Sequence, residues 1–89
     1  MCFVHFKDTL GWIAYRRGKY QEALSQLKDA VAQLSDQPMP KYHLGMTYIA
    51  LQQGENALEQ LNAAKALLKQ GDPLLAQIDA GLEKANAKK

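Results

Sequence analysis

The chain repeats itself with a period of 34 residues, and this feature constrains its fold more than any other. When residues 7–36 are aligned with residues 41–70, ten of the thirty pairs are identical. A chain of this composition would give about two or three such matches by chance. The identical pairs are Lys7/Lys41, Leu10/Leu44, Gly11/Gly45, Ala23/Ala57, Leu24/Leu58, Gln26/Gln60, Leu27/Leu61, Ala30/Ala64, Ala32/Ala66 and Leu34/Leu68. The two stretches are therefore expected to form the same supersecondary unit.

The composition predicts that this unit is helical. Alanine, leucine, glutamine and lysine dominate the sequence, and all four are good helix formers, whereas valine and isoleucine are scarce. We therefore expect an all-α fold without a sheet. The expected helices cover about residues 4–17, 20–34, 41–53, 55–70 and 73–86.

Glycine and proline mark the expected ends of these helices. Gly18 is expected to end the first helix, and Gly54 is expected to be the turn glycine of the second unit. Because two prolines cannot continue a helix, segment 35–40 is expected to be a connector. Asp72 is expected to cap the last helix, and Pro73 suits its first position.

Small residues recur at matched positions inside the expected helices. Gly11 and Gly45 lie in helix interiors, where a glycine costs about 1 kcal/mol relative to alanine. Such a cost needs a packing reason, which is the close approach of the two helices of one unit. The other small residues at matched positions are Ala23, Ala30, Ala57 and Ala64.

The order of these residues resembles that of a known family. Leu10-Gly11, followed by Ala23, Leu27 and Ala30, is similar to the L-G … A-x-x-x-F pattern of tetratricopeptide repeats, whose period is also 34. The resemblance covers about residues 4–70, and each of its motifs is weak when taken alone. The first part of the chain also resembles the C-terminal repeats of long bacterial proteins of this family. A bacterial origin is therefore expected, in the cytoplasm or the periplasm.

The resemblance implies a right-handed α-solenoid of two helix-turn-helix repeats, about 4–37 and 38–71, with a C-terminal capping helix of about 72–87. Residues 1–89 would form one such module. The chain departs from the family pattern at Lys7 and Lys41, where the family has a tryptophan. Three further positions depart from the pattern. Ala14 stands where the second repeat keeps the expected tyrosine, Tyr48. Ser35 replaces the closing proline, and Asp79 replaces a third glycine.

The resemblance also implies where a partner would bind. In the family, the first helices of successive repeats line a concave surface on which partner peptides lie. The matching positions here are Asp8, Trp12, Tyr15, Arg16, Tyr42, His43 and Met46. Chaperone-binding members carry lysine, asparagine and arginine at clamp positions that correspond here to Asp8, Trp12, His43 and Met46, which argues against that activity. An apolar or amphipathic segment anchored by Trp12 and Tyr42 is the expected partner.

Two alternatives to such binding stay open. Trp12 and Tyr15 could pack inside the module or against a preceding repeat. The first helix also carries an apolar patch of Phe3, Val4, Phe6 and Ile13. Upstream repeats or a second copy of the chain could cover that patch, and in the latter case the module is a homodimer.

Other classes of function lack support in the sequence. The formal net charge of +2 is too small for nucleic-acid binding, and no apolar run approaches the roughly 20 residues of a membrane span. The single cysteine, Cys2, excludes an internal disulfide and a cysteine-based zinc site. His5 and His43 have no catalytic or metal-binding spacing, and Asp8 could pair with His5 one turn away. We expect no enzyme activity, no cofactor and no bound metal.

Overall fold

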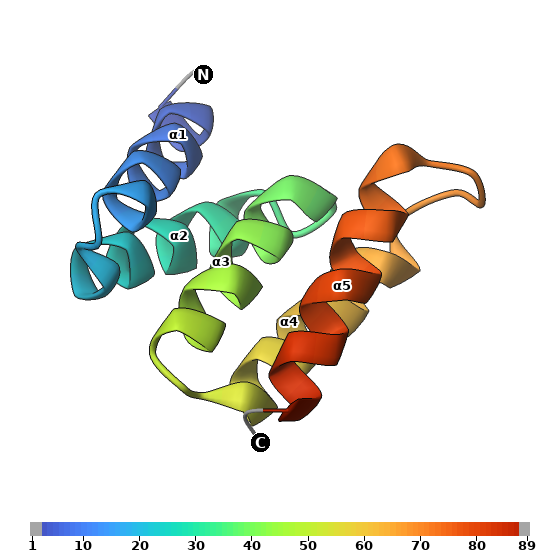
Figure 1. Ribbon diagram of the computed structural model, residues 1–89. Coiled ribbons are helices and arrows are strands. Elements are labelled where there is room, and N and C mark those ends of the chain that lie inside the picture. The colour runs from blue at the N-terminus through green and yellow to red at the C-terminus, as the bar shows by residue number, and fades with distance from the viewer. Residues whose placement is uncertain (1–2, 88–89) are drawn as a thin grey trace.

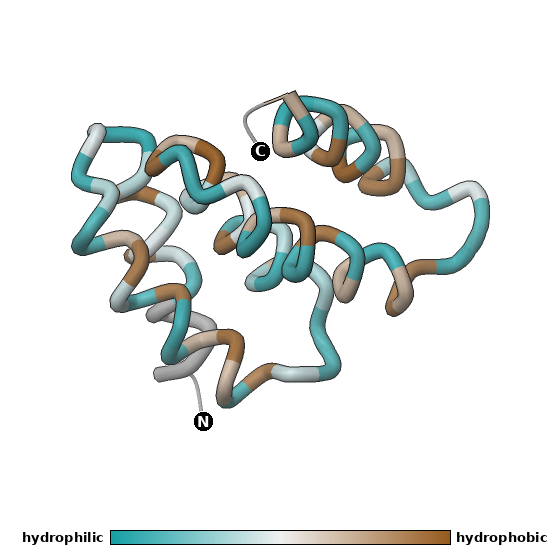
Figure 2. The backbone as a smooth tube through the Cα atoms, turned by 90° about the horizontal axis from the view of Figure 1, so that it is seen from below, coloured by the Kyte–Doolittle hydropathy of each residue, from teal (hydrophilic) through white to brown (hydrophobic). Residues whose placement is uncertain are grey.

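The computed structural model describes the backbone of residues 3–87 and the side chains of residues 8–87. These residues form five α-helices and no strand, so the expected all-α fold is confirmed (Figure 1). The helices are α1 (Phe3–Arg16), α2 (Tyr20–Gln33), α3 (Pro38–Ala50), α4 (Gly54–Ala66) and α5 (Pro73–Ala87). Each helix packs on the next, and α3 also contacts both α1 and α5. Along each helix, hydrophobic and hydrophilic segments alternate, as expected when one face is buried (Figure 2).

The helices of each hairpin, α1–α2 and α3–α4, approach each other at a glycine. A Cβ atom added to Gly11 would lie 2.6 Å from Cγ of Leu27, and one added to Gly45 would lie 2.7 Å from Cγ of Leu61. Both distances are shorter than real Cβ contacts allow, so neither helix pair could pack this closely with any other residue there. The packing reason predicted for both glycines is confirmed.

The turns inside the two hairpins have the same geometry. After α1, Gly18 has a φ of 81° and the amide of Lys19 donates to the carbonyl of Ala14 over 2.9 Å. After α3, Gln52 has a φ of 61° and the Gln53 amide makes the matching bond, to Tyr48. Both are Schellman motifs.

The predicted turn glycine of the second hairpin is therefore wrong. Gln52, which lies 34 residues after Gly18, takes the left-handed conformation, and Gly54 is the first residue of α4. The sequence suggested Gly54 because glycine adopts the left-handed conformation at little cost. The repeat register instead places Gln52 at the turn position.

Three other predicted boundaries are also corrected, and one of them is the end of α3, which lies at Ala50 rather than Gln53. Helix α3 begins at Pro38 rather than Lys41, with Pro40 in its first turn. Prolines are tolerated there because the first amides of a helix have no partner inside the helix. Helix α4 ends at Ala66 rather than Gln70, and the amides of Leu67 and Leu68 donate to the carbonyls three residues earlier.

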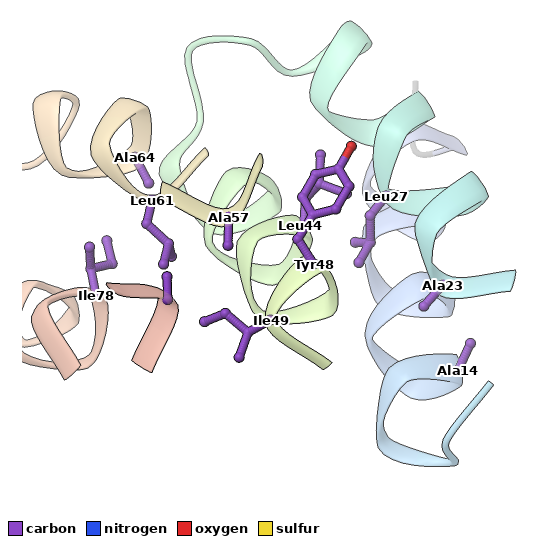
Figure 3. Close-up of a cluster of buried hydrophobic side chains, with 11 residues drawn as sticks. Ala14, Ala23, Leu27, Leu44, Tyr48, Ile49, Ala57, Leu61, Ala64 and Ile78 are labelled. Atoms are coloured by element: carbon purple, nitrogen blue, oxygen red, sulfur yellow. The ribbon is translucent and has the colours of Figure 1, made fainter. Parts of the chain in front are cut away.

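The core runs through all five helices as one cluster (Figure 3). Its largest fully buried apolar side chains are Leu27, Leu61 and Ile78, which come from α2, α4 and α5. The small residues predicted to allow close packing are fully buried, as expected. They are Ala23, Ala30, Ala57 and Ala64.

Helix α5 closes the open side of the second hairpin. It packs on α3 and α4, buries Ile78 and leaves Leu82 half-buried. Its start follows the prediction, because Oδ1 of Asp72 accepts a bond of 2.9 Å from the amide of Leu74 and Pro73 is the first helical residue. Asp79 forms an exposed ion pair of 2.8 Å with Lys65 of α4.

Candidate functional site

Aromatic rings join α1 to α3, and Trp12 lies at the centre of them. Its ring stacks on Tyr15 of the same helix, with centroids 4.6 Å apart and planes 5° apart. On its other side it stacks on His43 of α3, at 4.1 Å and 19°. Tyr42 lies 6.1 Å from Trp12 in a tilted arrangement. We call these four rings and Tyr20 the aromatic cluster.

Tyr20 belongs to the cluster, although the sequence analysis did not predict it. Its ring centroid lies 5.6 Å from that of Tyr15. Tyr20 is the first residue of α2, and the Schellman turn at Gly18 brings it back beside the end of α1. A signal was available in the sequence, because Tyr20 lies only two positions after Gly18, the residue expected to end the first helix.

A hydrogen-bonded pair lies beside the stacked rings. Nδ1 of His43 lies 2.8 Å from Oδ1 of Asp8, and both side chains are largely buried. An ionised carboxylate can only accept, so the Nδ1–H of His43 donates this bond. Together with the Trp12 stack, this bond ties α1 to α3. The predicted pairing of Asp8 with His5 concerns a side chain that lies outside the described residues.

Burial changes the acidity of two tyrosines in the cluster. Burial raises the pKa of Tyr15, and charge repulsion from Tyr20 and Tyr42 raises it further. Burial alone raises the pKa of Tyr42. Both phenols therefore stay neutral at physiological pH and can donate or accept hydrogen bonds.

The structure brings together five of the seven predicted site residues. They are Asp8, Trp12, Tyr15, Tyr42 and His43. Arg16 is exposed at the end of α1, one turn after Trp12.

Met46 faces the other neighbour of α3. A Cβ atom added to Gly81 of α5 would lie 3.4 Å from Sδ of Met46. Met46 lies 34 residues after Trp12, so each of these two side chains contacts the next helix along the series α1, α3, α5. All three of Trp12, Tyr42 and Met46 are half-buried, and a continuous stripe of them on one open surface stays a prediction.

Among the side chains of residues 8–87, no group of three or more histidine, cysteine, aspartate or glutamate residues is placed to hold a metal ion. None of the described helices is both long enough and apolar enough to cross a membrane. Comparison of the chain with protein-family models, curated proteins and solved structures found no match. The internal repeat and the geometry of the aromatic cluster are therefore the features that indicate a function.

Proposed function

We propose that the chain is a tetratricopeptide-type module that binds a segment of another protein and has no catalytic role. In this proposal the two hairpins are repeats of a right-handed α-solenoid, and α5 is its capping helix. The 34-residue period, the paired glycine–leucine contacts and the identical Schellman turns support the repeat assignment.

The observation that carries the binding proposal is the half-exposed aromatic cluster. Trp12 and Tyr15 stack on each other, Tyr42 packs on Trp12 in a tilted arrangement, and all three rings remain partly open to solvent. Rings fixed in this way lose little conformational freedom when a partner covers them, and aromatic side chains contribute most of the binding energy at many interfaces. Arg16 adds an exposed cation nearby. The arrangement favours an apolar segment that also carries a carboxylate.

Selection from a displayed library of random peptides tests this proposal on the complete chain. We expect peptides with apolar side chains and an acidic residue, whose binding weakens by roughly three- to tenfold in Arg16→Ala and at least as much in Tyr42→Ala. Arg17→Ala is the matched control, because this neighbouring arginine is also exposed but lies beyond the end of α1. Circular dichroism would verify that each variant is folded. Selected peptides that bind all four chains equally would contradict the proposal, as would a library that yields none.

Self-association is a second candidate function, favoured by the two apolar side chains that α1 exposes. Leu10 and Ile13 are both exposed on this helix. Sedimentation at several concentrations tests this candidate directly. A strict monomer in which α1 is helical would exclude it.

A further inference from the structure

The outer face of α1 differs from the matching face of α3 in how much of it solvent reaches. Leu10 and Ile13 are 37% and 43% exposed. The residues 34 positions later, Leu44 and Thr47, are 2% and 0% exposed. Leu44 lies on the side of α3 that faces Leu27 of α2 (Figure 3). The preceding hairpin therefore covers this face of α3.

Helix α5 gives a second example of the same arrangement. Ile78 and Gly81 lie 34 positions after Leu44 and Thr47, and both are buried. A Cβ atom on Gly81 would lie 3.2 Å from Cδ1 of Leu61 and 3.4 Å from Sδ of Met46. This face of α5 thus packs on both helices of the hairpin before it. The two later faces of the series are covered in one way, and the first is open.

The interior of the first hairpin gives no reason for the difference. Leu27 and Leu61 are equally buried, and so are the alanines beside them. The close contact at Gly11 also equals that at Gly45. Helix α1 is thus packed like α3 on its inner side, and its outer side alone lacks a neighbour among the described residues.

We infer that the face of α1 carrying Leu10 and Ile13 docks a further helical hairpin, of the kind that α1–α2 presents to α3. The occupant would offer a buried leucine from its second helix and a long side chain from its first, as Leu61 and Met46 do towards α5. The inference rests on the proposed repeat module and names a partner surface distinct from the aromatic cluster.

The covered faces also argue against a second copy of this chain as the occupant. A second copy could offer the outward surface of its hairpin α3–α4, but α5 already occupies that surface. In a symmetric dimer formed by two α1 helices, a single helix would cover this face of α1. The matching faces of α3 and α5 are each covered by both helices of a hairpin. The occupant is therefore a hairpin with a free outward surface.

An extended chain supplies such a hairpin. A second copy of residues 3–36 is inserted directly before Phe3 of the complete chain, which preserves the 34-residue spacing. Hydrogen exchange is then measured at the amides of Leu10 to Ile13 in the original α1, together with urea unfolding of both chains. Helicity is compared by circular dichroism.

We expect these amides to exchange at least about tenfold more slowly in the extended chain than in the parent. The double substitution Leu10→Gln with Ile13→Gln in the original α1 should abolish that slowing. In the parent it should change exchange by no more than about twofold, because the two side chains are exposed there. Leu67→Gln is the matched control, since Leu67 is exposed to a similar extent and lies beyond the end of α4. It should act equally in both chains.

Three results would overturn the inference. The first is unchanged exchange in α1 of the extended chain, and the second is an added hairpin that stays unfolded, although the same segment is helical in the parent. The third is a parent chain that dimerises and becomes monomeric with the double substitution, which would assign this face to a second copy. None of these results bears on peptide binding at the aromatic cluster, so the two proposals fail separately.

Discussion

The hairpins α1–α2 and α3–α4 have matching interiors and different exteriors. Inside, each has a glycine against a buried leucine and ends its first helix in a Schellman turn. Outside, α3 lies between α1 and α5, whereas α1 contacts only α2 and α3 among the described residues. Local sequence therefore specifies the contacts within a hairpin, and the burial of its outer face depends on a neighbour.

The largest effect is expected from the two buried leucines. Leu27→Ala and Leu61→Ala should each lower the free energy of unfolding by about 2–5 kcal/mol, because each leaves a cavity where no solvent reaches. If the interiors are equivalent, the two losses should agree to within about 0.5 kcal/mol. Urea unfolding of both variants provides the measurement. Losses that differ by more than this would show that the hairpins are not equivalent inside.

The glycines should reveal the difference outside. Gly45→Ala should destabilise the protein by about 1–3 kcal/mol, because its Cβ would overlap the fully buried side chain of Leu61. Gly11→Ala should cost less, since α1 can shift outwards on its open side while α3 is held by α1 and α5. Denaturation midpoints of the two variants test the order. A larger cost at Gly11 would contradict the open face of α1.

Exchanging the turn residues should shift stability by smaller amounts in opposite directions. Gln52→Gly should raise the free energy of unfolding by about 1 kcal/mol, because glycine adopts a φ of 61° without strain. Gly18→Gln should lower it by a similar amount. A Cβ added to Gly18 meets no atom within 4 Å, so backbone strain alone sets the cost. Thermal unfolding of the two variants gives the sign, and the same sign for both would rule out matching turns.

The smallest effect is expected at alkaline pH. Because the pKa of Tyr15 is raised in the folded chain, the unfolded chain ionises first, near pH 10. The contribution of Tyr15 to the free energy of unfolding is therefore fully present below about pH 10. It falls as the pH rises from there through the higher pKa of Tyr15 in the folded chain. Tyr15→Phe should make this fall shallower. The second hairpin has Ile49 at the matching position, which does not ionise. Urea unfolding at several alkaline pH values would test this, and an unchanged slope in Tyr15→Phe would refute it.

The sequence predicted features that depend on residues close to one another in the repeat. The glycine contacts and the start of α5 at Asp72 and Pro73 belong to this class. The predicted start of α3 was wrong because Pro38 and Pro40 were treated as residues that break a helix interior. In the first turn of a helix, a proline costs little. The strain at Gln52 was missed because it follows from the register of the fold rather than from the residue itself.

The sequence could not predict which side chains of one hairpin contact those of the next. Asp8 and His43 are 35 residues apart, and their bond exists only because α1 packs on α3. Trp12 and Met46 each contact the next helix of the series α1, α3, α5, which the sequence did not predict. Such contacts depend on the angle between packed helices, which composition and period do not determine.

The position of Trp12 has a practical consequence for spectroscopy. It is the only tryptophan of the sequence, and its ring lies between Tyr15 and the imidazole of His43. Its fluorescence therefore reports on the contact between α1 and α3 rather than on the folding of the whole chain. If α1 separates from α3 before the other helices unfold, tryptophan emission will change while most of the helical circular dichroism signal persists. The chain thus carries its own optical probe for the separation of α1 from α3.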